Sequence, residues 1–291
     1  MIPASMRKLW RWSKQLVRKW LPVQHAPTAA QPAGPALSEN DALNLQLEQA
    51  VALIGRCSPE LVVAKRYLVP SAHKLYDFRE EAGFSPIARE VLAQGRTLLD
   101  YNRLLTLWQA VQNTWPLGYP VAEVGTFRGG SAWFLAAALR HWSCDPPIHV
   151  FDTFTGHPNI IDPTRDGPHI EKLFADTSAE AVQLYLTEFP KVEMHVGAFA
   201  DTCGTIANNK FALVHIDVDL FRSTVQALAF FWPRLVPNGV IIIDDYGFSS
   251  CVGLKEAVDQ FVMDQDPGQL GKWYIHTGQV VLTRLALDAA A

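Results

Sequence analysis

The stretch VAEVGTFRGGS, residues 121–131, decides the fold. Its first half is apolar and predicts a short strand, its middle is a glycine turn, and its end opens a helix. Gly125 lets the backbone approach a bound molecule closely, and Gly129 and Gly130 free the first turn of the helix. The spacing differs from the GxGxxG of dinucleotide sites, and the acid Glu123 at the strand end would repel a pyrophosphate. A cationic amino-acid or sulfonium cofactor suits such a turn better.

Short apolar segments alternate with helical segments on the carboxyl side of this stretch. Strands are expected at residues 120–125, 147–152, 192–196, 211–218, 239–244 and 278–284. Helices are expected at 130–141, 178–188, 222–235 and 252–264. This alternation predicts an α/β fold, a Rossmann-like, doubly wound, mostly parallel sheet with helices on both faces. Ligands of such sheets bind at the carboxyl ends of the strands.

Acidic residues follow three of the expected strands. Asp152 ends the second strand, where an acid typically accepts hydrogen bonds from ribose hydroxyls, which indicates a nucleoside cofactor without choosing its kind. Asp217 closes one later strand, and Asp244 and Asp245 close the next, with a helix between them. Parallel strands joined by one crossover helix often lie side by side, so these three carboxylates are expected to converge. Their mutual repulsion and their oxygen-only donor set predict a Mg²⁺ site.

Two histidines lie near these elements. His215 precedes Asp217 by two residues and could orient it, and His276 precedes the last strand and could face a substrate. A structural role is the preferred interpretation for both.

The amino-terminal part of the chain has a different character. Residues 6–21 predict an amphipathic helix with Trp and Leu on one half and six Lys and Arg on the other, within a first stretch, 1–22, that holds no acid. Peripheral membrane contact and docking on a protein surface are equally good interpretations of this pattern. Residues 23–44 predict a Pro/Ala-rich linker, and 45–291 predict the main domain, which begins with a helical extension.

Composition limits the remaining classes. The chain has 291 residues, 49% of them hydrophobic, and a formal net charge of −4, so it carries no overall electrostatic bias toward nucleic acid. Its four cysteines form no CxxC pair, so neither a structural zinc site nor a disulfide framework is expected. No apolar run reaches the roughly 18 residues that span a bilayer. A cytoplasmic protein follows as the default, with the membrane surface as the alternative through residues 6–21.

Four blocks of sequence together resemble the macrocin O-methyltransferase family. They are AEVGTFRGGS at 122–131, FDTFTG at 151–156, HIDVDL at 215–220 followed by Ser223 and Thr224, and GVIIIDDYG at 239–247. The blocks keep the family's order and spacing, and the likeness covers residues 95–285. Thr155 and His157 depart from it, since the family commonly shows Glu and an aliphatic residue there.

The resemblance implies a methyltransferase that uses S-adenosylmethionine and Mg²⁺ to methylate a hydroxyl, often on a sugar of a natural product. It implies cofactor contacts through the first motif and Asp152, a stretch at 97–98 that folds over the cofactor, metal binding by the three strand-end aspartates, and a general base at Asp217. The cofactor residues of the first motif would be Glu123, Gly125, Thr126 and Ser131.

Other functions stay open at this level. A catechol or phenol O-methyltransferase shares the fold, cofactor and metal. A nicotinamide-dependent oxidoreductase uses a similar sheet, although GxGxxG is missing. An inactive methyltransferase-fold binding protein is the third alternative, which the intact set of acids disfavours. The expected partner is a small hydroxylated acceptor, and the oligomeric state is left open, a homo-oligomer included.

Overall fold

The computed structural model describes Gln49, residues 83–158 and residues 160–286. The chain divides into two units, Met1–Lys74 and Leu75–Ala291, and the description below concerns the second. The amphipathic helix expected at 6–21 and the linker expected at 23–44 lie outside the described residues. Among the helices that are described, none is long and apolar enough to cross a membrane.

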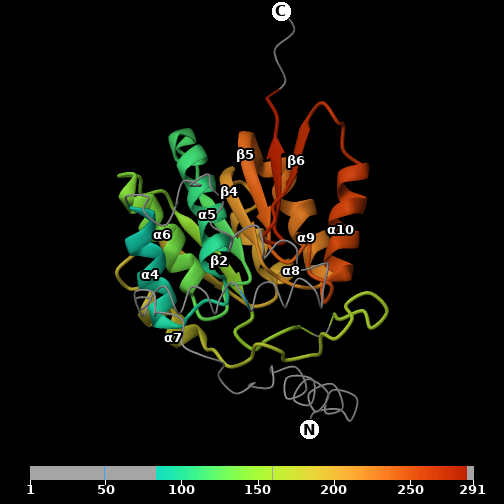
Figure 1. The fold of residues 1–291 in the computed structure, drawn as a ribbon, viewed down its shortest axis with the longest axis horizontal. Coiled ribbons are helices and arrows are strands. Elements are labelled where there is room, and N and C mark those ends of the chain that lie inside the picture. Colours follow the sequence, from blue (N-terminus) through green and yellow to red (C-terminus); the bar gives the residue numbers. More distant parts are fainter. Residues whose placement is uncertain (1–48, 50–82, 159, 287–291) are drawn as a thin grey trace, which may run out of the picture. The chain divides into compact units, whose positions relative to one another are not determined.

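A sheet of seven strands forms the centre of the second unit (Figure 1). Its strands are β1 (Val121–Val124), β2 (Ile148–Asp152), β3 (Val192–Val196), β4 (Phe211–Ile216), β5 (Leu235–Ile243), β6 (Leu270–Tyr274) and β7 (Val280–Arg284). They lie in the order β3-β2-β1-β4-β5-β7-β6. The first five strands are parallel, and β7 runs antiparallel to both β5 and β6. The expected doubly wound, mostly parallel sheet is therefore confirmed.

The strand predictions were wrong at two places. β6 was not expected, because its sequence LGKWY contains a glycine and is largely exposed at the sheet edge, where no alternation marks it. β5 begins at Leu235 rather than at residue 239, and its exposed segment Pro237–Asn238 hides this early start in the sequence.

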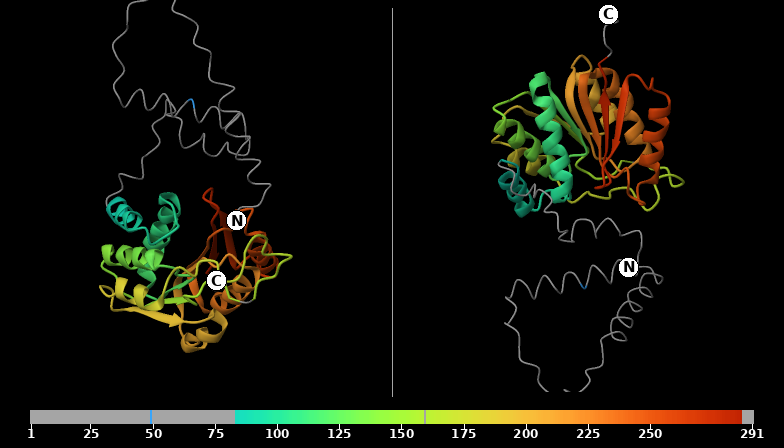
Figure 2. Two further views of the ribbon diagram at one scale, coloured as in Figure 1. Left: turned by 90° about the horizontal axis from the view of Figure 1, so that it is seen from below. Right: turned by 45° about the horizontal axis from the view of Figure 1, so that its top comes forward.

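Helices cover both faces of the sheet, as Figures 1 and 2 show. One face packs against α4 (Phe84–Gln94), α5 (Tyr101–Thr114) and α6 (Gly130–His141). The other packs against α8 (Phe199–Thr202), α9 (Phe221–Phe231) and α10 (Val252–Met263). The remaining elements are α7 (Ala179–Tyr185) and the short 3₁₀ helices η3 (Trp115–Leu117), η4 (Cys203–Ile206) and η5 (Trp232–Arg234).

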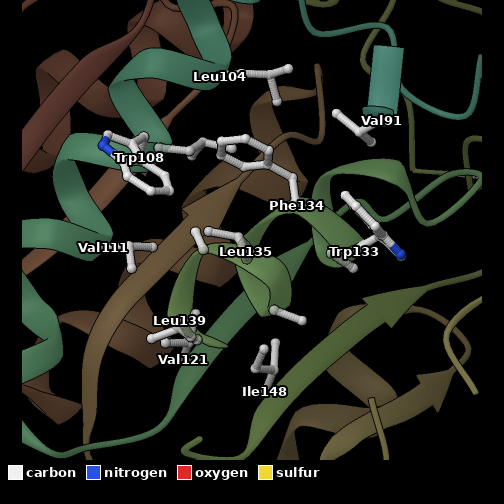
Figure 3. Packing of buried hydrophobic residues seen from close by; sticks show 14 of the residues in the cluster. Val91, Leu104, Trp108, Val111, Val121, Trp133, Phe134, Leu135, Leu139 and Ile148 are labelled. Carbon is white, nitrogen blue, oxygen red and sulfur yellow. The ribbon is translucent and has the colours of Figure 1, made fainter. Parts of the chain in front are cut away.

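The central strands divide their side chains between two hydrophobic cores. Val121 belongs to the core under α4, α5 and α6, whereas its neighbour Ala122 belongs to the core under α8, α9 and α10. Figure 3 shows the first core, where Trp108 and Phe134 lie above the β1 and β2 side chains. By the same alternation, Glu123 projects from β1 toward the side of α5.

A long loop, residues 153–178, joins β2 to α7 across the carboxyl edge of the sheet. The fully buried Asp166 fixes it by accepting hydrogen bonds from the backbone N–H groups of Asp162 and of Phe221, each at 2.7 Å. Gly253 in α10 adds to the close fit, since a Cβ there would lie 2.8 Å from the Arg165 carbonyl oxygen. Loops of this length without helix or strand are uncommon and are usually functional.

Candidate active site

A cavity of about 340 Å³ opens at the carboxyl ends of β1, β2, β4 and β5, below the loop 153–178. This is where ligands bind in open α/β sheets. Six of the eight candidate residues line it: Gly125, Thr126, Ser131, Asp152, Asp217 and Asp245. Glu123 and Asp244 do not, because both are fully buried beneath its floor.

The glycine turn after β1 is held by Asp152. One carboxylate oxygen accepts from the backbone N–H groups of Thr126 (2.9 Å) and Phe127 (2.7 Å), and the other accepts from that of Phe154 (2.7 Å). Burial raises the pKa of Asp152 even though these hydrogen bonds oppose the rise. Asp152 therefore shapes the turn and still presents its carboxylate to the cavity.

Gly125 cannot be replaced without moving the backbone. Its φ of +89° is one that L side chains rarely adopt, and a Cβ would lie 1.7 Å from the carbonyl oxygen of Asp217. The turn after β1 thus rests directly on the end of β4.

A buried row of polar side chains crosses the sheet below the cavity. His215 lies opposite Glu123 in the β1–β4 register, and its Nδ1 is 2.9 Å from a Glu123 oxygen. Its Nε2 is 2.6 Å from Asp244, and the second Glu123 oxygen accepts from the Thr126 hydroxyl at 3.0 Å. Burial lowers the pKa of His215, but the hydrogen bonds to Asp244 and Glu123 outweigh it and raise the pKa to about 10. An imidazolium therefore bridges two carboxylates.

This row places two sequence predictions differently. Both carboxylate oxygens of Glu123 are engaged, one by the Thr126 hydroxyl and the other by His215. Glu123 therefore holds the glycine turn from beneath the cavity and does not line the cavity itself. His215 was expected to orient Asp217, but its two ring nitrogens contact Glu123 and Asp244 instead.

Arg103 of α5 lies at the Asp244 end of this row. Its guanidinium lies 3.2 Å from an Asp244 oxygen and 3.3 Å from an Asp245 oxygen. Gln279, also fully buried, donates to Asp244 at 3.2 Å. Sequence reasoning missed Arg103, although it is the single charged residue of α5.

Negative charge remains in excess at the ends of β4 and β5. Burial, and then the charges of Asp244 and Asp245, raise the pKa of Asp217 well above its usual value. Burial, and then the charges of Asp219 and Asp244, raise the pKa of Asp245 to about 7. Crowded carboxylates of this kind suit a hard divalent cation, so the donor set fits Mg²⁺ in charge and chemistry.

The three expected metal ligands do not all form one cluster in the described residues. Donor atoms of Asp217 and Asp244 lie within 4.8 Å of one another, together with His215. Asp245 instead groups with Asp219 and Cys251. Arg103 contacts one oxygen of Asp244 and one of Asp245, so part of this donor set is already paired with a cation.

Four further polar groups face the cavity from the loop side, and the sequence did not single them out as a set. His157 Nε2 lies 3.1 Å from Asp219 Oδ2, Cys251 Sγ lies 3.6 Å from Asp219 Oδ1, and His169 Nε2 lies 3.5 Å from Cys251 Sγ. Burial raises the pKa of Asp219, but hydrogen bonds from His157 and Asp245 outweigh burial and hold the pKa below its usual value. Burial raises the pKa of the Cys251 thiol to about 12, so the thiol stays protonated at neutral pH and is a poor nucleophile.

The strand order, the antiparallel β7 and a cavity at the glycine turn together define a class I methyltransferase. Solved methyltransferases share this fold: the O-methyltransferase NovP (TM-score 0.57, 23% identity, covering 81% of this chain and 100% of that one) and the calicheamicin methyltransferase CalS11 (TM-score 0.56, 17% identity, covering 90% and 99%). At these identities the likeness concerns the fold alone.

The family follows from the sequence match. The model of the macrocin-O-methyltransferase (TylF) family matches residues 73–267, and the chain belongs to this family. A tetracenomycin-type rhamnosyl 4'-O-methyltransferase of Streptomyces olivaceus is 30% identical over 199 residues, covering 64% of this chain and 75% of the relative. The mycinamicin III 3''-O-methyltransferase of Micromonospora griseorubida is 30% identical over 201 residues, covering 62% and 77%. The resemblance in the sequence motifs is thereby confirmed, and the protein is a methyltransferase.

Proposed function

We propose that this enzyme transfers the methyl group of S-adenosylmethionine to a hydroxyl of a sugar or another natural-product acceptor, with Mg²⁺ at the strand-end aspartates. One observation carries the proposal: the glycine turn and Asp152 form one wall of the cavity, and Asp217 forms the adjoining wall. A donor and an acceptor in this cavity would lie side by side, and positioning of this kind supplies a large part of the rate of a group transfer.

The donor half binds a nucleoside with a positively charged centre. S-adenosylmethionine supplies an electrophilic methyl group on its sulfonium. Asp152 lines the cavity and offers carboxylate oxygen to ribose hydroxyls, while Gly125 admits the ligand close to the backbone. Ser131 and Thr126 add hydroxyl groups to the same wall. Glu123 acts through Thr126, which it holds in place, rather than by touching the ligand.

The acceptor half activates the hydroxyl. A carboxylate oxygen of Asp217, which lines the cavity, takes the hydroxyl proton. The methyl group passes to the acceptor oxygen, the sulfonium becomes a neutral thioether, and the proton leaves to solvent from Asp217. Mg²⁺ held by Asp217, Asp244 and Asp245 would supply positive charge that lowers the pKa of the acceptor hydroxyl.

A sugar hydroxyl is the first acceptor class to test. The relatives named above are a rhamnosyl 4'-O-methyltransferase and a mycinamicin 3''-O-methyltransferase, and both names point to natural-product acceptors. A catechol or phenol acceptor is the alternative within the same chemistry. The family assignment disfavours the nicotinamide-dependent oxidoreductase and the inactive binding protein.

Calorimetry with S-adenosylhomocysteine tests the cofactor, with and without Mg²⁺ and with NADH as the control. We expect binding of the homocysteine compound and none of NADH. Absence of binding in both metal conditions would refute the role given to Asp152 and the glycine turn. Methyl transfer to glycosylated acceptors, compared with catechols in the same assay, then identifies the acceptor class.

A further inference from the structure

We propose that His157, His169, Asp219 and Cys251 form a binding site for a transition-metal dication of the zinc type. It differs in chemistry from the acid-only set of Asp217, Asp244 and Asp245, because it combines two imidazoles, one thiol and one carboxylate; Asp245 lies beside Asp219 and Cys251 at its edge.

Three contacts link the four side chains in the order His157, Asp219, Cys251 and His169. They measure 3.1 Å for His157 Nε2 to Asp219 Oδ2, 3.6 Å for Asp219 Oδ1 to Cys251 Sγ, and 3.5 Å for Cys251 Sγ to His169 Nε2. Zinc bonds of about 2.0–2.1 Å to nitrogen or oxygen and about 2.3 Å to sulfur place tetrahedral donors roughly 3.3–3.6 Å apart. His157, His169 and Asp219 each offer a donor atom within 4.8 Å of the other two, and Cys251 adds a fourth donor beside Asp219 and His169.

The two rings are available as ligands. Nδ1 of His157 and Nδ1 of His169 are buried and have no hydrogen-bond partner among the described residues. The His157 side chain is 8% exposed, and the two ring centroids are 5.2 Å apart. Nε2 of each ring faces another donor of the set, and a ring that binds an ion through Nε2 carries its proton on Nδ1.

The donor types select the ion. Thiolate and imidazole favour Zn²⁺ and its neighbours, whereas Mg²⁺ prefers oxygen. Four protein donors complete a tetrahedral shell, as in structural zinc sites. Binding would release the thiol proton of Cys251 to solvent, since the thiolate is the metal ligand.

The site would join three separate parts of the chain. His157 and His169 lie in the loop 153–178, Asp219 follows β4, and Cys251 immediately precedes α10. Asp219 has φ of 60°, an unusual value for a residue other than glycine, which indicates that its surroundings fix its orientation. An ion here would cross-link the loop to the sheet edge and stabilise the acceptor side of the cavity.

Cobalt titration of the full chain, stripped of metal with a chelator, tests the site. Co²⁺ gives a thiolate charge-transfer band only when sulfur coordinates it. We expect the band to saturate at one equivalent, to persist in excess Mg²⁺, and to disappear in Cys251→Ser. A variant with serine at Cys57, Cys144 and Cys203 should keep the band. Zn²⁺ competition should show affinity at least about tenfold weaker for His157→Leu.

Two controls isolate the result. The cluster His149, Glu193 and His195 could also hold cobalt, but it has no thiol and so gives no such band. Circular dichroism of each variant without metal confirms folding. A wild-type chain without the band at one equivalent, or a band that survives in Cys251→Ser, would overturn the proposal. The titration needs neither methyl donor nor acceptor, so its outcome and that of the proposed methyl transfer are independent.

Discussion

Replacing His215 by leucine should cost more stability than any ordinary loss of a buried side chain. The imidazolium is fully buried between Glu123 and Asp244, which are also fully buried, at 2.9 and 2.6 Å. Leucine would leave Glu123 in the interior without a cation and Asp244 with Arg103 as its remaining cation. Removing one partner of a buried ion pair typically costs about 3–5 kcal/mol, against a total stability of about 5–15 kcal/mol for a domain.

Urea unfolding followed by circular dichroism, in metal-free buffer, measures this loss. His149→Leu is the matched control, because His149 is also buried and burial lowers its pKa, and its carboxylate neighbour at 3.3 Å, Glu193, is exposed. Its contacts to His195 (3.2 Å) and Asn209 (3.1 Å) are hydrogen bonds between neutral groups, worth about 0.5–1.5 kcal/mol each. Equal losses in the two variants would refute the imidazolium bridge.

The pH dependence gives a second readout of the same bridge. The folded pKa of His215, about 10, lies above its ordinary value of 6.5. The stabilisation is therefore complete below pH 6.5 and falls as pH rises toward 10, by up to about 1.4 kcal/mol per pH unit. His215→Leu should lack this slope, and adding Glu123→Gln should recover part of its stability by removing one buried charge. A wild-type stability that stays flat between pH 7 and 9 would contradict the reasoning.

Four further outcomes are expected. Gly125→Ala should abolish S-adenosylhomocysteine binding in calorimetry, whereas Gly118→Ala, also at positive φ but with nothing within 4 Å of the new Cβ, should retain it; equal binding would refute the backbone contact. Asp217→Ala should abolish methyl transfer while S-adenosylhomocysteine still binds, and retained turnover would remove its role as base. Arg103→Gln should tighten Mg²⁺ binding in calorimetry, since the guanidinium no longer holds the two aspartates that it bridges; unchanged affinity would mean that they do not bind the metal. The full chain should float with anionic vesicles and a chain lacking residues 1–22 should not, and equal flotation would exclude membrane contact through this basic segment.

The sequence predicted the strands that are buried on both faces of the sheet, because each of them is a mostly apolar run. β1, β2 and β4 are apolar runs bounded by glycine or aspartate, and the sequence locates them to within one or two residues. β6 left no such mark, because it pairs with only one neighbour and is mostly exposed. Tertiary pairing, not local sequence, makes it a strand.

The site was predictable in part for a related reason. Residues at the ends of adjacent parallel strands must meet, so the neighbourhood of Asp217 and Asp244 follows from topology. Which way a carboxylate turns does not follow, as Glu123 shows by facing His215 rather than the cavity. His157 and His169 lie in a loop without periodicity, and no pattern in the sequence brings them to Cys251.

The contact between Gly125 and the Asp217 carbonyl has a consequence for how such an enzyme can change. It sets the separation of the two halves of the cavity through main-chain atoms, which side-chain substitutions elsewhere leave alone. The loop 153–178 lines the same cavity without being part of that contact. Replacing this loop with that of a relative should therefore change which acceptor binds while the distance between the two halves of the cavity stays the same. Acceptor selectivity and the methyl-transfer step can then evolve through different segments of the chain.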